Sequence, residues 1–232
     1  MAKQPKASDT TEENTTETMD TTQKTPNFKA ELISYVLDHD KRPTSAYTLA
    51  KALGVPESAF YDEYNSIEMI EKEIWGGFFD ETNTILQADS EYQTYTVREK
   101  MLSFYFTWIQ VLKDNRSYVL FCDKNRRKGD LNPFFLHIAK EKTIELMKEF
   151  VNEGIATNEI SARPFLSDRY GDLLWGQAML VLRFWVKDDS KSFQNTDAMI
   201  EKAVNTSFAL MGETFLDSLF DLGKFAVQNR KK

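Results

Sequence analysis

The sequence contains one cysteine, two histidines and no long uninterrupted apolar run in its 232 residues. A single cysteine cannot form an intrachain disulfide, and Cys122 ends the apolar run Tyr118-Val-Leu-Phe-Cys, so we expect it to fill a core. The apolar runs are shorter than the roughly 20 residues that a membrane-spanning helix needs. These absences favour a soluble protein of the cytoplasm.

Signatures of catalysis and of metal binding are also missing. His39 and His137 are far apart in the sequence, and neither has a cysteine or carboxylate at a metal-ligand spacing. A glycine-rich phosphate loop, a nucleophile elbow and a paired-carboxylate pattern are all absent from the sequence. We therefore predict a non-enzyme with no catalytic residues, no metal site and no cofactor.

The charge and the first residues of the chain restrict its interactions further. A net charge of −7 argues against non-specific nucleic-acid binding by the whole chain, although a local basic face remains open. Residues 1–26 contain eight threonines, several acids, no aromatic residue and no valine or isoleucine, so we expect a disordered tail. No apolar stretch follows Lys3 and Lys6, so a secretory signal is not expected.

Helical periodicity dominates the rest of the sequence. Asn-Gly and Asp-Gly hairpin turns are absent, and alternating strand patterns do not recur. We predict an all-α fold, and in the helix over 66–87 an apolar stripe of Ile70, Ile74, Gly77, Phe78 and Ile85. The predicted helices span 27–39, 45–53, 56–63, 66–87, 95–114, 116–123, 132–153, 166–187, 196–212 and 214–228.

The clearest local pattern lies in residues 44–70. Ser45 can cap a short helix, Gly54 can end it, and Pro56 can start a second one, which is the arrangement of a helix-turn-helix motif. The second helix, however, contains Glu57, Asp62 and Glu63 and no basic residue. Residues 28–74 hold five basic and nine acidic residues, a net charge of −4, which would weaken binding to phosphates.

On these residues the chain resembles the TetR family of bacterial regulators over 27–228. Thr44 to Val55 is similar to the family's second helix and turn, and Ala59-Phe60-Tyr61 with Tyr64 and Ser66 to its reading helix. The resemblance implies a helix-turn-helix domain over 27–72, a ligand-binding and dimerisation domain over 73–232, and a homodimer. The residues implied to meet DNA are Thr44, Ser45, Tyr47, Lys51, Ser58 and Tyr61.

The same resemblance places a small apolar or lipid ligand and the dimer contacts in the C-terminal helices. The implied ligand residues are Phe78, Phe79, Tyr105, Phe106, Trp108, Phe134, Phe135 and Trp175. The implied dimer residues are Leu174, Met179, Leu182, Val204 and Phe208. Aromatic residues at helical spacing are more often ordinary core, and both apolar helices over 170–187 and 196–212 can instead bury themselves within a monomer.

A second resemblance gives an alternative function. The segment from Trp185 to Lys202, with its Asp-x-Ser-x-x-Phe-x-x-Thr pattern, is similar to the coenzyme-Q biosynthesis accessory protein family, which implies a lipid- or isoprenoid-binding protein that does not bind DNA. The amphipathic segment 214–232 could then contact a membrane or an enzyme partner, or pack on its own bundle. The basic run Lys124-Asn-Arg-Arg-Lys could contact an anionic group or only solvent.

Overall fold

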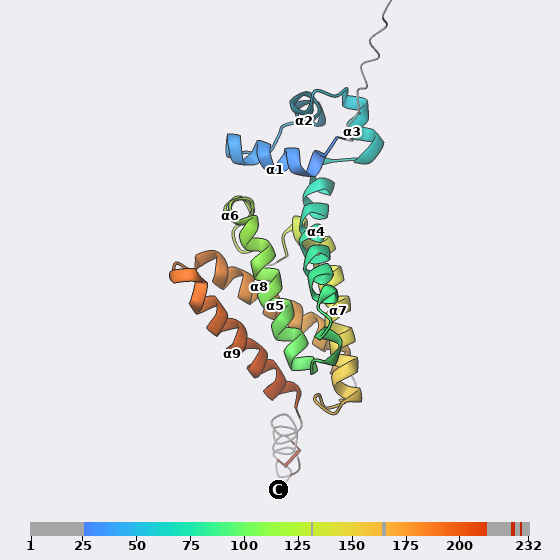
Figure 1. Cartoon of the computed structure of the whole chain (residues 1–232), viewed down its shortest axis with the longest axis vertical. Coiled ribbons are helices and arrows are strands. Elements are labelled where there is room, and N and C mark those ends of the chain that lie inside the picture. The colour runs from blue at the N-terminus through green and yellow to red at the C-terminus, as the bar shows by residue number, and fades with distance from the viewer. Residues whose placement is uncertain (1–25, 131, 164–165, 213–223, 226–227, 229–232) are drawn as a thin grey trace, which may run out of the picture.

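The computed structural model describes residues 26–130, 132–163, 166–212, 224–225 and 228. Within these residues it contains nine α-helices, four short 3-10 turns and no strand, which confirms the all-α prediction. A small group of three helices lies at one end of the molecule and a larger helical bundle forms the rest (Figure 1). Among the described residues, no helix is both long and apolar enough to cross a membrane.

The three-helix group consists of α1 (Phe28–His39), α2 (Ala46–Leu53) and α3 (Glu57–Glu63). Its caps follow the predicted pattern: the Ser45 side chain accepts a hydrogen bond from the Thr48 amide, and Gly54 ends α2 with a positive φ of 71°. Phe28, Leu49 and Phe60 are at most 1% exposed and form the small core.

Helix α4 (Ile67–Ala88) runs from this group into the bundle, where it packs on α5 and α7. The predicted stripe on this helix was partly wrong. Gly77 is exposed and Ile85 is 47% exposed, whereas Trp75 and Phe79 are buried. Because α5 and α7 both cover the helix, its buried face is wide, and Gly77 lies outside it at 100° per residue.

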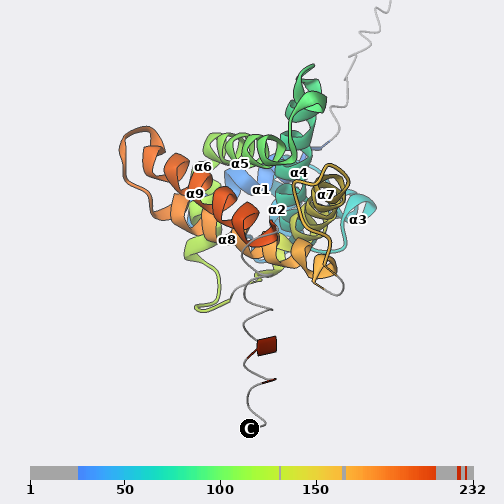
Figure 2. The same cartoon turned by 90° about the horizontal axis from the view of Figure 1, so that it is seen from below.

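The remaining helices are α5 (Val97–Asp114), α6 (Arg116–Lys124), α7 (His137–Ala156), α8 (Tyr170–Lys187) and α9 (Gln194–Met211). Two predicted starts were too early: Pro133 is extended and a 3-10 turn over Phe134–Leu136 precedes α7, while another over Ser167–Arg169 precedes α8. The predicted helix over 214–228 lies almost entirely outside the described residues. In the bundle α8 packs on α7, and α9 packs on α5 and α8 (Figure 2).

The turn between α8 and α9 is held by a buried carboxylate. Asp188 accepts hydrogen bonds from the Ser190 amide at 2.9 Å, from the Thr196 amide at 2.9 Å and from the Thr196 hydroxyl at 2.6 Å. Burial of the carboxylate opposes its ionisation, but these hydrogen bonds outweigh burial and lower the pKa of Asp188 to about 2. The ionised carboxylate therefore fixes the start of α9.

We expect Asp188→Asn to lower the free energy of unfolding at pH 7. Because the folded pKa of Asp188 is about 2, below its unfolded value, the contribution of the carboxylate is complete above about pH 4 and is lost as the pH falls through 2. The difference between wild type and variant should therefore narrow between pH 4 and pH 2 in urea titrations. Asp189→Asn, at the exposed neighbouring position, is the matched control and should show no such narrowing.

Candidate functional site

The predicted DNA-contact residues lie together on the outside of the helix-turn-helix group. Thr44, Ser45, Lys51 and Ser58 are exposed, and Tyr47 and Tyr61 are 56% and 57% exposed. Folding thus buries one side of α2 and α3 and leaves two aromatic rings and several hydroxyl groups in solvent. Such a surface has the donors and rings that can meet a sugar-phosphate backbone or base edges.

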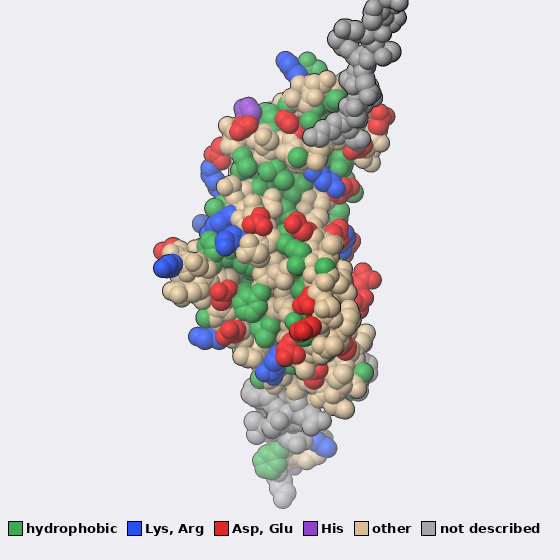
Figure 3. Space-filling view, viewed as in Figure 1, with side chains coloured by type: hydrophobic (Ala, Val, Ile, Leu, Met, Phe, Trp, Pro, Cys, Tyr) green, Lys and Arg blue, Asp and Glu red, His purple; other side chains and the backbone are tan. Residues whose placement is uncertain are grey.

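The charge on this surface is unfavourable for DNA. Glu57, Asp62 and Glu63 are all exposed, and no ion pair involving them is found in the described part of the chain. Lys29 is paired with Glu73 at 2.9 Å, so one of the five basic residues is already partly neutralised. Figure 3 shows acidic and basic side chains interspersed on the face in view rather than a broad basic area.

A second basic residue, Arg42, is paired with a buried carboxylate and is 29% exposed. Its Nε donates to Glu71 Oε1 at 2.5 Å and its Nη2 to Glu71 Oε2 at 2.9 Å, and Glu71 is only 1% exposed. The guanidinium carbon also lies 5.4 Å from the ring centroid of Phe121 in α6 and 5.7 Å from that of Phe134. Arg42 therefore joins the loop before α2 to α4, α6 and the turn before α7, and its charge is largely neutralised by Glu71.

Cys122 borders this junction and has no exposed surface. Burial, reinforced by the nearby charge of Glu71, raises the pKa of the Cys122 thiol to about 12. The thiol therefore stays protonated at neutral pH, which is the inert core role that the sequence indicated.

The predicted ligand residues do not share one environment. Phe106 is 37% exposed on the outside of α5, and Phe134 covers Arg42. The other six are buried, and several pack ring against ring, with Trp75 and Phe135 stacked at 5.3 Å and Phe104 and Trp108 at 6.1 Å. A hollow beside Phe135 has a volume of about 20 Å³, room for little more than one water. The described aromatic residues thus pack as a core.

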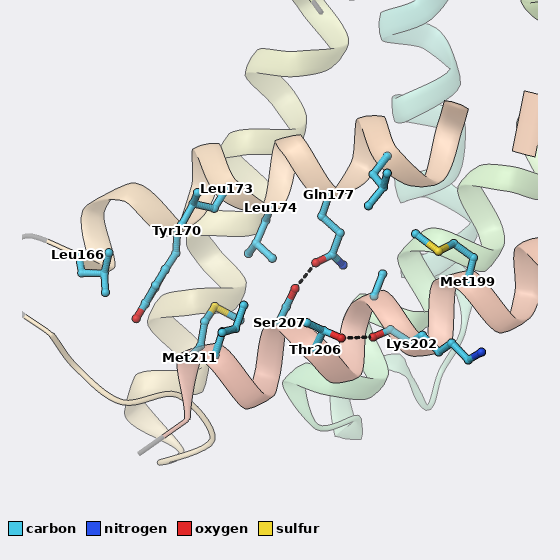
Figure 4. Close-up of a pocket in the computed structure, with 13 residues that line it drawn as sticks. Leu166, Tyr170, Leu173, Leu174, Gln177, Met199, Lys202, Thr206, Ser207 and Met211 are labelled. Carbon is cyan, nitrogen blue, oxygen red and sulfur yellow. Dashed lines mark hydrogen bonds between the residues drawn. The ribbon is translucent and has the colours of Figure 1, made fainter. Parts of the chain in front are cut away.

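A much larger hollow lies between α8 and α9, on the outer side of the bundle (Figure 4). Its volume is about 640 Å³ and its lining is mainly apolar. At its floor the Ser207 hydroxyl donates to Gln177 Oε1. The lining residues are Leu166, Tyr170, Leu173, Leu174, Gln177, Leu180, Met199, Lys202, Ala203, Thr206, Ser207, Leu210 and Met211. We call this hollow the α8–α9 groove.

The residues predicted to form the dimer face the interior of a single chain. The exposed fractions are 2% for Leu174, 6% for Met179, 7% for Leu182, 0% for Val204 and 4% for Phe208. Leu174 nevertheless lines the α8–α9 groove, where a second copy can contact it. Because α8 is apolar nearly all round, the sequence pattern did not distinguish its inner from its outer face.

Sequence reasoning missed the apolar side chains that do reach the surface of α8 and α9. Leu173 is 60% exposed, Leu180 54%, Phe184 40% and Leu210 42%. On α8 they recur at spacings of seven and four residues, which is a helical stripe. On α8, α7 approaches closely at one glycine: a Cβ on Gly171 would lie 3.0 Å from Lys148 Cγ of α7, whereas Gly176 is open.

The two histidines lie apart in the structure. His39 stacks on Tyr35 with ring centroids 4.2 Å apart, and His137 is exposed at the start of α7. Among the described residues, no group of three or more histidine, cysteine or carboxylate side chains is arranged to hold a metal ion.

Removing one partner of the Arg42–Glu71 pair should be strongly destabilising. We expect Arg42→Met to lower the free energy of unfolding by about 3–5 kcal/mol, because it leaves the carboxylate of Glu71 buried without a counter-charge. The double variant Arg42→Met with Glu71→Leu should recover most of that loss in denaturant titrations. Equal stability of the single and double variants would contradict this interpretation.

Three comparisons place the fold among known proteins. Residues 100–226 match the family model described as the tetracyclin repressor-like C-terminal domain. A putative TetR family transcription regulator from Shewanella sp. PV-4 is 17% identical, with a TM-score of 0.51 over 80% of this chain and 96% of that chain. A protein of unknown function from Rhodococcus sp. RHA1 is 12% identical, with a TM-score of 0.52 over 84% of this chain and all of that one. No curated protein matches. Because the family model covers more than half of the sequence, the chain belongs to the TetR-like family of transcription regulators.

Proposed function

We propose that the protein is a dimeric, ligand-responsive transcriptional regulator that binds operator DNA weakly through α2 and α3. The observation that carries this proposal is the exposed surface of Tyr47, Tyr61 and Lys51 on a helix-turn-helix group whose caps and core are intact. Large aromatic rings exposed to solvent favour a binding role, so Tyr47 and Tyr61 argue that this helix-turn-helix group still binds DNA.

The affinity of this surface for DNA is limited by its charge. Phosphate neutralisation supplies nearly all non-specific affinity, and Arg42 and Lys29 are paired with carboxylates. Lys41 and Lys51 are the exposed cations that remain on the loop before α2 and on α2 itself. Glu57, Asp62 and Glu63 face the same solvent. We therefore expect DNA binding to be detected mainly at low salt.

The effector in this proposal is a small apolar molecule that enters the C-terminal bundle. The buried aromatic residues, including Phe78, Trp108 and Trp175, offer rings but few ionisable groups, which favours an uncharged ligand. Since these rings pack closely in the described structure, a ligand among them must displace side chains. Such displacement could reach the DNA-binding group through Arg42, which contacts α4 and α6 at once.

A second candidate is a lipid- or isoprenoid-binding accessory protein that does not bind DNA. The pairing of Arg42 with Glu71 at the domain junction, added to the acidic α3, favours this alternative. In that case the segment 214–232 would supply contact with a membrane or an enzyme partner.

One experiment separates the two candidates. The natively purified protein is extracted for mass spectrometry of bound small molecules, and the same sample is used to enrich genomic fragments at low salt. Enriched DNA with a repeated half-site supports the regulator. A recovered isoprenoid or acyl lipid without DNA enrichment supports the accessory protein and overturns the first proposal.

Reversing the acidic charges of α3 should strengthen DNA binding. We expect Glu57→Lys, Asp62→Lys and Glu63→Lys together to raise affinity for enriched DNA fragments at least tenfold at low salt. The slope of log affinity against log salt should steepen by up to about 2.7, if all three lysines meet phosphates. Fluorescence anisotropy measures both quantities.

The matched control for this variant reverses charges far from α3. Asp172→Lys, Asp197→Lys and Glu201→Lys change the same net charge at exposed positions on α8 and α9. If this control raised DNA affinity as much as the α3 variant did, the effect would be one of net charge and not of the proposed DNA surface.

The proposed dimer is tested on the exposed stripe of α8. We expect Leu180→Glu, which puts a charge on a side chain that is now 54% exposed and apolar, to raise the dimer dissociation constant at least tenfold in sedimentation experiments. Leu120→Glu, at a 37% exposed position on α6, is the control. An unchanged dimer in Leu180→Glu would place the interface elsewhere.

A further inference from the structure

The end of α6 and the loop after it concentrate positive charge in a chain whose net charge is −7. Residues 123–130 hold four basic and two acidic residues. Arg127 and Lys128 are exposed, and no ion pair is found for either of them in the described part of the chain. The DNA contacts proposed above do not use these residues, so the local excess of cations favours a different anionic partner.

Two arginines of this region meet at a single backbone oxygen. Arg126 Nη1 donates to the carbonyl oxygen of Asp130 at 3.3 Å, and Arg183 Nη2 of α8 donates to the same oxygen at 3.1 Å. The Asp130 carboxylate accepts from the Asn132 amide at 2.9 Å instead. Arg126 also pairs with Asp123 at 2.7 Å, whereas no ion pair is found for Arg183 among the described residues. Two guanidinium groups on one neutral oxygen repel each other, and an anion between them would accept charge-assisted hydrogen bonds from both.

The same two arginines lie at the edge of an apolar hollow between α6 and α8. It is the hollow of about 20 Å³ beside Phe135, and it is lined on the core side by Trp75 of α4 and Val119 of α6, each 1% exposed. Arg126 and Arg183 are half-buried in its lining. A charged edge and an apolar interior are thus joined in one site, which suits a ligand that has both characters. We call this site the α6–α8 hollow.

The α6–α8 hollow can widen on the side of α8. Met179 and Leu182 line it there and are 6% and 7% exposed. A methionine side chain has three rotatable bonds, so Met179 can move aside without displacement of the helix. Because the surrounding core is closely packed, a chain of methylene groups displaces fewer side chains than a ring does. The hollow therefore favours a slender ligand.

We propose that the α6–α8 hollow binds an organic anion with a slender apolar tail, which is the chemistry of a fatty acid. The carboxylate lies between Arg126 and Arg183 and replaces the Asp130 carbonyl as their shared acceptor. The tail passes Met179 towards Trp75. The charge stays at the half-buried edge, so only methylene groups enter the core and no ionised group has to be fully buried.

This inference deepens the proposed function, because the ligand is its apolar effector with an anionic group added at one end. The role of the ligand as effector rests on that function. Asp123 at the edge of the hollow belongs to α6, and Phe121 of the same helix covers Arg42. An anion that draws Arg126 away from Asp130 therefore acts close to the contact between the bundle and the helix-turn-helix group.

Binding is tested with sodium decanoate, below its micelle concentration, on the full chain without DNA. We expect isothermal titration calorimetry to show that decanoate binds about tenfold more tightly than 1-decanol, which has the same chain and no charge. In Arg126→Gln with Arg183→Gln, the affinity for decanoate should fall about tenfold, to that for 1-decanol. Lys113→Gln removes an exposed cation near the end of α5 and should change neither affinity.

The position of the tail is tested by nuclear magnetic resonance of isotope-labelled methionine methyl groups. Decanoate should shift the methyl resonance that is missing in Met179→Leu, whereas acetate, which lacks the tail, should leave it unmoved. No binding of decanoate, equal affinities for decanoate and 1-decanol, or an unmoved Met179 resonance would overturn the proposal. Unchanged decanoate affinity in the double glutamine variant would also overturn it.

A single variant keeps the test decisive if the double variant does not fold. Among the described residues Arg183 bonds only to the backbone carbonyl of Asp130, so Arg183→Gln should fold and should still lower decanoate affinity at least about threefold. Full decanoate affinity in this variant would contradict the proposed seat of the anion. Because the titrations contain no DNA, decanoate binding without any effect on DNA affinity would count against the proposed function and not against the site.

Discussion

The ion pair between Arg42 and Glu71 is the contact on which the relation between the two parts of the molecule depends. It joins a loop of the helix-turn-helix group to α4 at a site where the carboxylate is 1% exposed, and the rings of Phe121 and Phe134 close over the guanidinium. A buried pair of this kind adds little net stability but is very costly to break on one side. The orientation of α2 and α3 is therefore coupled to α6 and to the turn before α7.

This coupling and the weak DNA surface have the same physical origin. In the helix-turn-helix group, Arg42 is paired with Glu71 at the junction, so the connection to the bundle neutralises one of the few cations of this group. Two exposed cations, Lys41 and Lys51, are then outnumbered by three exposed carboxylates, those of Glu57, Asp62 and Glu63. In such a regulator the pair couples the DNA-binding group to the bundle but weakens the attraction of that group to DNA phosphates. Its DNA affinity must then come from aromatic and hydroxyl contacts, or from the second half-site that a dimer binds.

Local features of the fold could be predicted from the sequence, and non-local ones could not. Ser45 and Gly54 act within three or four residues, so capping chemistry located them correctly. Arg42 and Glu71 are 29 residues apart in the sequence, and the rings that cover Arg42 are still more distant in the sequence. No local sequence pattern could therefore predict this junction. The capping box of Thr96 and Glu99 did have a signal, the Thr-x-x-Glu spacing, which sequence reasoning did not use.

The outer face of α8 and α9 illustrates the limit of hydrophobic patterns. Where a helix is apolar on two sides, the pattern cannot tell which side meets the core and which meets a partner, so the sequence did not distinguish Leu174, which is 2% exposed, from Leu173, which is 60% exposed. Only packing resolves it, because α7 approaches one side closely at Gly171. Once the inner side is assigned, the exposed stripe and the groove beside it must be covered by something.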